Sequence, residues 1–152
     1  MASVFGRKFL GFSLWVVRGG EVKLKVAKKP LIAFKRRIRE LTRRLGGRSM
    51  MDVVDRLRSY LLGWKGYFCY VQTPGILQKL DKWVRHRLRA ILLKSWRHSH
   101  VIYRELMKLG APARIARMVA SKRLGWWRNI NRHIKYVLTV AYFDQLGVPQ
   151  LC

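Results

Sequence analysis

Apolar positions recur in two different rhythms along the chain. Near the N-terminus, residues 9–17 and 21–26 form two short β-rich runs separated by Arg18-Gly19-Gly20. In the second run, valine and leucine alternate with lysine, which is the pattern of a strand with one packed and one charged face. Glycines suit the positive-φ positions of a tight turn, so the two runs predict a β-hairpin.

The apolar rhythm becomes helical after this hairpin. Pro30, Pro74 and Pro112 each stand directly before an apolar periodic segment, where the first helical turn has no use for the N–H that proline lacks. In the first segment the apolar residues keep a 3-4 spacing that confines them to one stripe. This stripe consists of Leu31, Phe34, Ile38, Leu41 and Leu45, and Gly46-Gly47 is the predicted helix stop.

Further helices follow the same logic. Ser49 and Asp52 form a capping-box pair, which predicts a second helix that continues through Gly63 and Gly66 to Phe68. A third helix of about 24 residues is predicted from Pro74 to Arg97. Its inner stripe is Ile76, Leu77, Leu80, Val84, Leu88 and Ile91. Shorter helices are expected over residues 102–109, 112–121 and 136–146.

These elements predict a mainly α fold, in which a short N-terminal β-hairpin precedes an antiparallel three-helix bundle and further short helices. The expected divisions are 1–28 for the hairpin, 29–98 for the bundle and 99–152 for a C-terminal helical region. The last boundary is placed near His98-Ser99-His100. The C-terminal third is expected to pack either on the bundle or on something outside the chain.

Charge narrows the class of partner. The 152 residues include 33 Lys and Arg against 7 Asp and Glu, a net charge of +26, while half of the residues are hydrophobic. This chain is too apolar for a disordered cationic tail. Because self-repulsion at such a charge opposes compaction, a polyanion is the expected partner: RNA, DNA or anionic lipid.

The cysteine content and the length of the apolar runs indicate the cellular compartment of the protein. Cys69 and Cys152 form no CxxC pair, which favours a reducing compartment, and we expect a cytoplasmic protein of a bacterium or an organellar matrix. No apolar run reaches the roughly 18 residues that span a bilayer, so no membrane partner is expected. The order of residues 7–17 is weakly like a signal peptide, but a strand is the favoured interpretation.

The first predicted helix carries cations on the whole face opposite its apolar stripe, with Glu40 as the one acid there. A solvated helix ordinarily mixes charges of both signs, so this face favours nucleic-acid binding over a merely soluble surface. The RNA-binding residues predicted on the hairpin and this helix are Lys23, Lys25, Lys28, Lys29, Lys35, Arg36, Arg39 and Arg43.

The third helix adds a second basic side. Its predicted RNA-binding residues are Lys82, Arg85, Arg89, Trp96 and Arg97. On one interpretation, the indole of Trp96 stacks on an unpaired base while the arginines hold phosphates. On the other, Trp96 packs beneath the C-terminal third, as large aromatic residues usually do.

Catalytic and metal-binding patterns are poor in this sequence. It has no adjacent Asp-Asp pair, no GxxxxGK[ST] loop and no GxSxG turn. His86, His98 and His100 lack a carboxylate or thiol at a familiar ligand spacing. We therefore expect a binding protein with no catalytic site, no metal and no cofactor.

Four motifs occur in order along nearly the whole chain from Phe9: Phe-Leu-Gly-Phe at 9–12, Leu-Gly-Trp-Lys-Gly-Tyr-Phe at 62–68, Leu-Asp-Lys-Trp-Val-Arg-His-Arg-Leu-Arg at 80–89, and Ala-Tyr-Phe-Asp-Gln-Leu-Gly-Val-Pro at 141–149. Together they resemble the C-terminal part of group II intron reverse transcriptase/maturases. In that family the first motif lies in the primer-grip hairpin that ends the palm. The helices after it form the thumb, or domain X, and the last third contacts DNA.

The resemblance implies a thumb-like bundle that binds group II intron RNA and assists its splicing or mobility. Duplex DNA or an RNA–DNA hybrid, and a separate palm-containing portion of the enzyme, are further implied partners. Gly63, Trp64, Tyr67 and Phe68 are implied to be mainly core. Residues implied to lie on or near the nucleic-acid face are Arg85, Arg87, Arg89, Trp96, Arg97, Tyr103 and Arg104, and those implied to contact DNA are Lys122, Arg123, Trp127 and Arg128.

The sequence also departs from this family. Family members are RNA-directed DNA polymerases, but the chain has no Tyr-X-Asp-Asp motif, so we expect no polymerisation by it alone. Two alternatives stay open: a truncated, non-functional remnant of such an enzyme, and a generic cationic protein that binds polyanions or membranes. The membrane alternative is disfavoured because the apolar stripes of three successive helices can cover one another.

Overall fold

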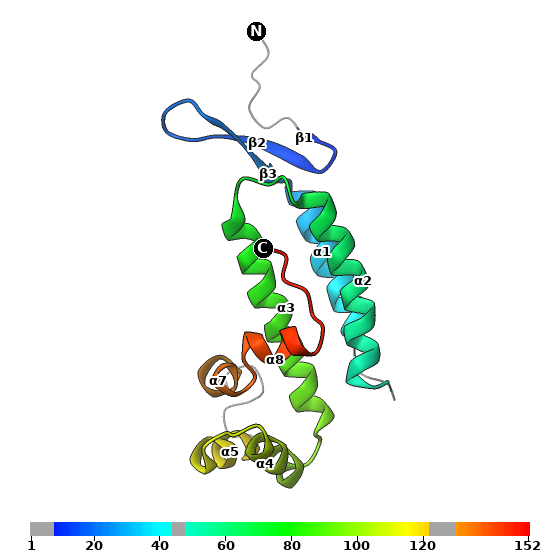
Figure 1. Cartoon of the computed structure of the whole chain (residues 1–152), viewed down its shortest axis with the longest axis vertical. Helices are drawn as coiled ribbons and strands as arrows, with labels where there is room; N and C mark the ends of the chain where they lie inside the picture. Colours follow the sequence, from blue (N-terminus) through cyan, green and yellow to red (C-terminus); the bar gives the residue numbers. More distant parts are fainter. Residues whose placement is uncertain (1–7, 44–47, 122–129) are drawn as a thin grey trace.

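The computed structural model describes the chain except residues 1–7, 44–47 and 122–129. The described chain is elongated, with a small sheet at one end and three long helices along its length (Figure 1). The pair of short helices α4 (Ser99–Lys108) and α5 (Ala113–Ala120) lies at the other end. The predicted mainly α fold with an N-terminal hairpin is confirmed.

The sheet has three antiparallel strands in the order β1 (Lys8–Phe9), β2 (Phe12–Val16) and β3 (Val22–Val26). The predicted hairpin is the pair β2–β3, which places Leu14 opposite Leu24. The expected continuous strand over 9–17 is wrong, because the chain turns back at Leu10-Gly11, where φ is 47° and 84°. A Cβ on Gly11 would also lie 3.2 Å from the Pro30 ring, so glycine suits both the conformation and the contact.

Hydrogen bonds dock this sheet onto the helix ends. The Gly11 carbonyl accepts from the Ala27 N–H at 2.8 Å, and the Leu10 carbonyl accepts from the Tyr67 hydroxyl at 2.6 Å. Leu24 exchanges two bonds with Gln72, whose side-chain oxygen accepts at 3.1 Å and whose N–H donates at 3.0 Å. Gln72 therefore covers part of the β3 edge, and the Phe-Leu-Gly-Phe turn joins the sheet to the bundle.

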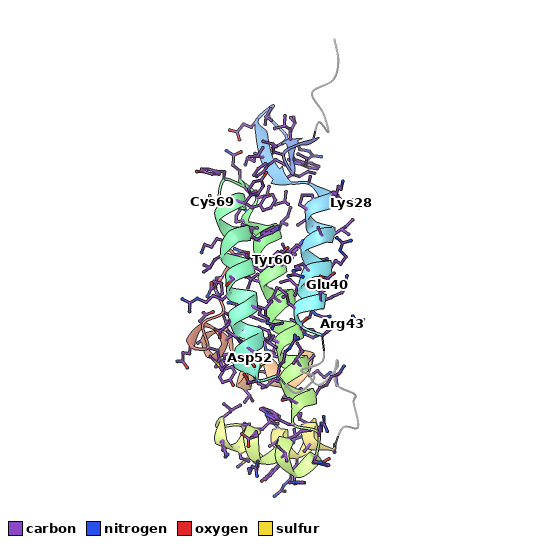
Figure 2. The ribbon with its side chains drawn as sticks, turned by 90° about the vertical axis from the view of Figure 1, so that its right-hand side faces the viewer. Lys28, Glu40, Arg43, Asp52, Tyr60 and Cys69 are labelled. Carbon is purple, nitrogen blue, oxygen red and sulfur yellow. The ribbon has the colours of Figure 1, made fainter. Side chains whose placement is uncertain are left out.

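The bundle consists of α1 (Lys28–Leu41), α2 (Met50–Phe68) and α3 (Pro74–Ser95). Figure 2 shows α1 and α2 side by side and antiparallel, with Lys28 and Cys69 at one end and Arg43 and Asp52 at the other. The predicted capping box is confirmed: the Ser49 hydroxyl accepts from the Asp52 N–H, and the Asp52 carboxylate accepts from the Ser49 N–H. The helix α1 ends at Leu41, before the predicted stop at Gly46-Gly47, which lies outside the described residues.

The described residues of the predicted apolar stripes form the core of the bundle, and Leu45 of the first stripe lies outside the described residues. Five of the six α3 stripe residues are buried, and Ile76 is half-buried. An aromatic series crosses from the sheet into the helices, with ring centroids 5.1 Å apart for Phe12 and Phe68, 4.3 Å for Phe68 and Trp64, and 4.6 Å for Trp64 and Phe34. Trp64 and Phe68 are core residues as expected, but Gly63 and Tyr67 are exposed, so that expectation is wrong for these two.

The C-terminal third contains α4 (Ser99–Lys108), α5 (Ala113–Ala120), the π-helical turn η1 (Ile130–Ile134), α7 (Lys135–Val137) and α8 (Val140–Gln145). The single helix expected over 136–146 is interrupted at Leu138, and Thr139 starts α8 by accepting from the Tyr142 N–H at 3.3 Å. Its buried residues join one continuous core with those of the bundle, so this third packs on the bundle. The domain boundaries at 28 and 98 stay a prediction.

The last residues return along the bundle as an extended segment. We call residues 148–152 the C-terminal strap; it lies beside α3 (Figure 1). Its Leu151 is buried, and the Leu151 N–H donates to both oxygens of Asp81 at 3.1 Å. The strap and α8 therefore cover one side of α3.

Candidate nucleic-acid interface

The outer face of α1 carries the basic residues that its sequence pattern predicts. Phe34 and Ile38 are fully buried, while Lys35, Arg36 and Arg39 are exposed on the other side of the helix. Glu40 contacts Arg36 at 4.0 Å and Arg37 at 3.1 Å. The carboxylate of Glu40 thus pairs with two cations, Arg36 and Arg37, and the outer face of α1 keeps a large positive charge.

The start of α1 is also basic. Lys28 and Lys29 are exposed in its first turn, which has no acidic residue. Cations at a helix N-terminus oppose the helix dipole and cost about 0.3–1 kcal/mol each. Helix stability therefore does not explain these two lysines.

A cluster of three cations lies between α1 and α3, around the half-buried indole of Trp83. The distances to the ring centroid are 5.9 Å for Lys35 Nζ, 5.6 Å for Arg39 Cζ and 5.5 Å for Arg87 Cζ. These contacts are within the range of cation–π attraction. We call these four residues the Trp83 cluster.

Arg87 is held in place within this cluster. Its Nε donates to Thr42 Oγ1 at 3.0 Å, and the Thr42 hydroxyl donates to the Ile38 carbonyl at 2.6 Å. Burial, together with the positive charge of Arg39, lowers the pKa of Arg87 from its ordinary value. Over the described residues, no ion pair joins a carboxylate to Lys35, Arg39 or Arg87. The cluster is therefore a concentration of like charge beside an aromatic ring.

Sequence reasoning missed Trp83. The spacing between Trp83 and Arg87, and that between Lys35 and Arg39, is four residues, which places each pair on one helix face. That spacing was a usable signal within each helix. The meeting of the two pairs depends on how α1 packs against α3, which no local pattern contains.

Arg85 and Arg89 require a correction, because the structure places both in the interior. Arg85 is 2% exposed, and its guanidinium contacts Asp81 at 3.3 Å and Asp144 at 2.7 Å. Arg89 donates to the Leu138 carbonyl at 2.7 Å, and its Cζ lies 5.5 Å from the Phe143 ring centroid. Although both line the wall of a pocket beside Lys82 and Gln150, their partners are in this chain. They attach α8 to α3 and do not belong to an exposed nucleic-acid face.

Burial also shapes the charge balance around these two arginines. Burial, with the nearby charge of Arg85, lowers the pKa of Arg89. Burial raises the pKa of Asp81, against the opposing effects of the Leu151 N–H and Arg85. For Asp144, burial acts upward, but hydrogen bonds from Arg85 and Gln150 prevail and lower its pKa. These groups are balanced against one another rather than offered to a ligand.

Other predicted residues near the end of α3 have mixed positions. Trp96 is half-buried at the C-cap of α3 and packs against the core, so the packing interpretation is the one the structure supports. Tyr103 also packs against the core. Lys82 and Arg97 are exposed, and Arg104 is exposed and pairs with Glu105 at 3.1 Å.

The remaining predicted residues lie on the hairpin, just beyond the end of α1 and in residues 122–129. On the hairpin, Lys23 contacts Glu21 at 4.0 Å, and Lys25 Nζ lies 4.4 Å from the Trp15 ring centroid. Arg43 is exposed just beyond the end of α1. The predicted DNA-binding residues Lys122, Arg123, Trp127 and Arg128 lie outside the described residues.

Across residues 8–43, 48–121 and 130–152, no group of three or more His, Cys, Asp or Glu side chains is arranged to hold a metal ion. In the same ranges, no helix is both long enough and apolar enough to cross a membrane.

Residues 31–110, more than half of the chain, match the family described as "Group II intron, maturase-specific domain". The chain belongs to this family. The resemblance found from the four sequence motifs is thereby confirmed. The matched span of this maturase-specific domain contains all four residues of the Trp83 cluster. A search of curated proteins finds none that matches the chain.

Proposed function

We propose that this maturase-specific domain binds group II intron RNA through the outer face of α1 and the adjoining Trp83 cluster, and assists the splicing or mobility of that intron without a catalytic step of its own. The observation that carries the proposal is the uncompensated charge of this face. Among the described residues, Glu40 is the one carboxylate that pairs with this face, and it contacts only Arg36 and Arg37. The exposed cations of the face are Lys35, Arg36, Arg37, Arg39 and Arg43.

Physical chemistry supports a folded RNA as the ligand. A one-sign face repels itself and gains free energy when phosphates displace its counterions. Helices packed on a common core hold such cations at defined spacings, which suits a partner that is recognised by shape and backbone position. Binding that favours the active intron fold would promote splicing by shifting the population of RNA conformers.

Duplex DNA, an RNA–DNA hybrid and a palm-containing portion of the enzyme are the further partners that we propose. Family membership is the reason for proposing these partners, since the reverse transcriptase/maturases that the chain resembles copy their intron RNA after it has been inserted into DNA. The face described above carries no preference among phosphate backbones by itself, because phosphate contacts hold no sequence information.

The test is equilibrium binding of the purified chain to a folded group II intron RNA, a scrambled RNA of equal length and duplex DNA, each across a salt series. We expect the intron RNA to keep at least a tenfold preference near physiological salt, about 1.4 kcal/mol beyond the phosphate contribution. Equal binding of all three ligands, with release at the same salt concentration, would instead establish a generic polyanion binder and overturn the proposal.

Splicing assistance is tested separately. The same intron RNA is incubated at a magnesium concentration where it self-splices slowly, with and without the protein. We expect the wild-type chain to increase the splicing rate and an Arg36→Ala/Arg39→Ala variant to increase it less. A rate that does not respond to the protein would leave RNA binding without a splicing role.

A further inference from the structure

We propose that the Trp83 cluster binds one phosphodiester of the nucleic-acid backbone, shared between Arg39 and Arg87. This inference rests on the proposed function, because it assigns a particular phosphate contact to the face that meets the RNA. It adds the class of group that is bound and the two helices that bind it together.

Charge crowding is the first argument. Three cations from two helices approach one indole ring to within 6 Å of its centroid. The ring attracts each of them but carries no net charge, so the repulsion among them remains. The nearest acid in sequence, Glu40, is engaged by Arg36 and Arg37. An anion placed between Arg39 and Arg87 would neutralise a repulsion that the chain itself leaves in place.

Preorganisation is the second argument. The bond from Arg87 Nε to Thr42 Oγ1 fixes the orientation of this guanidinium. In the described part of the chain, no hydrogen bond engages the two terminal nitrogens of Arg87 or any donor of Arg39. Guanidinium groups with free terminal N–H donors match the geometry of phosphate oxygens. Part of the entropic cost of binding is thus already met in the free protein.

The position of the cations also bears on the role of the ring. Lys35, Arg39 and Arg87 all lie over Trp83, so the indole is already engaged by cations of its own chain. Trp83 accordingly orders the cations, and the group they bind is a phosphate. Such a site reads the position of the backbone and is indifferent to base identity.

The contrast with Arg89 strengthens the assignment. Arg89 also lies over an aromatic ring, that of Phe143, but its Nε donates to a backbone carbonyl and its neighbour Arg85 pairs with two carboxylates. There two carboxylates of the chain, Asp81 and Asp144, balance the positive charge beside the ring. In the Trp83 cluster, no carboxylate of the described residues pairs with Arg39 or Arg87, and the ligand supplies the missing negative charge.

The experiment measures how binding to folded intron RNA depends on salt for Arg39→Gln, Arg87→Gln and the double variant. The matched control is Arg56→Gln, which removes one exposed cation from α2, outside the cluster. Each single variant should reduce the magnitude of the slope of log K against log salt by about 0.7–0.9, the value of one phosphate. The double variant should lose no more than that, because the two arginines share one phosphate. Arg56→Gln should keep the wild-type slope.

Two results would overturn the site: single variants with the wild-type slope, or a double variant that loses twice as much as each single variant. Circular dichroism melts establish that each variant is folded. If Arg87→Gln loosens the helix pair by removing the Thr42 bond, Arg87→Lys serves instead. This variant keeps the positive charge but loses the two terminal guanidinium nitrogens. Its slope of log K against log salt should therefore stay near the wild-type value, while its affinity for the RNA falls.

The same titrations separate this site from the proposed function. Preference for intron RNA over scrambled RNA tests the function, whereas the slopes of the variants test the site. If the slopes of the variants fall as expected but intron RNA is not preferred, the phosphate site is supported and the proposed function is wrong. If intron RNA is preferred but the slopes of the variants stay at the wild-type value, the proposed function is supported and the phosphate site is wrong. In a duplex DNA arm, an equal loss of slope assigns the site to any phosphodiester backbone, and an unchanged slope confines it to RNA.

Discussion

Two sides of α3 use arginine in opposite ways. On the side that faces α8 and the C-terminal strap, Arg85 and Arg89 are buried and bound to carboxylates, a carbonyl and an aromatic ring of the same chain. On the side that faces α1, Arg87 shares Trp83 with two other cations and pairs with no carboxylate among the described residues. Arg87 lies two positions from both Arg85 and Arg89 in the sequence. Because all three residues are arginines, the residue type does not distinguish the buried, paired role from the unpaired one.

The comparison teaches that the partners of a cation indicate its function better than its charge does. A buried arginine that is paired with carboxylates inside the chain contributes to the fold, because its removal leaves those carboxylates without their cation. A half-buried arginine crowded by like charges has incomplete pairing, which an anionic ligand can complete. Four predictions test this division.

The largest effect is expected from Arg85→Ala. This substitution leaves Asp81 and Asp144 without their cation and removes the ion pair that joins α8 to α3. We expect a loss of about 3–5 kcal/mol in the free energy of unfolding, measured by urea denaturation. A variant as stable as wild type would show that this side of α3 is not structural, and the comparison would fail.

A similar or slightly smaller loss is expected from Leu88→Ala. Leu88 is fully buried between the two arginine sides, so its truncation tests the register of α3 without touching charge. Core truncations of this kind cost about 2–5 kcal/mol. Thermal denaturation measures the loss, and RNA affinity at a temperature where the variant is folded should match wild type. An unchanged melting temperature would contradict the packing of α3 described above.

The exposed side is probed by Arg36→Ala with Arg39→Ala. Both residues lie on the outer face of α1, away from the buried stripe, so stability should change little. The slope of log K against log salt for RNA should flatten by about one to two, because each lost phosphate contact removes up to roughly 0.9. A titration series between low and physiological salt measures it, and an unchanged slope would remove α1 from the interface.

The smallest effect concerns pH and Asp144→Asn. Hydrogen bonds from Arg85 and Gln150 outweigh burial and lower the pKa of Asp144 below 3.8, its ordinary value. A carboxyl with a lowered pKa in the folded state stabilises the fold above its unfolded pKa, and this contribution is lost as pH falls through the folded pKa. The difference in stability between wild type and Asp144→Asn should therefore be full near neutrality and shrink below about pH 4.

Chemical denaturation at a series of pH values between 7 and 3 measures this difference. Burial raises the pKa of Asp81 in the same network, so its contribution has the opposite sign and is lost as pH rises through its folded pKa. Comparison of the two proteins at each pH isolates Asp144. A difference that grows on acidification would contradict the assigned direction.

Much of the fold was predictable from local patterns. The Ser49–Asp52 capping box, the start of α3 at Pro74 and the α3 stripe all depend on residues within a few turns of one another, and the structure confirms them. The errors occur where backbone geometry overrides the apolar pattern. The chain reverses at Leu10-Gly11 inside an apolar run, and Thr139 interrupts a helical pattern by capping the next helix.

The candidate site was predictable only in part. The basic face of α1 followed from one helix and its 3.6-residue period, and the structure places those side chains at the surface. Trp83 was missed because its cations come from a second helix. Arg85 and Arg89 were placed outside because their carboxylate and carbonyl partners, Asp144 and Leu138, lie about fifty or more residues further along the chain.

By itself, the sequence determined the helical class, the apolar stripes, the excess of positive charge and the family of this chain, since each of these depends on composition or on spacing along one element. Only the tertiary structure decided which arginines are buried and paired inside the chain and which lie nearer the surface. Periodicity places a residue on a side of its helix, but burial depends on what covers that side. Here α8 and the strap cover Arg85 and Arg89, whereas α1 brings further cations to Trp83 and Arg87.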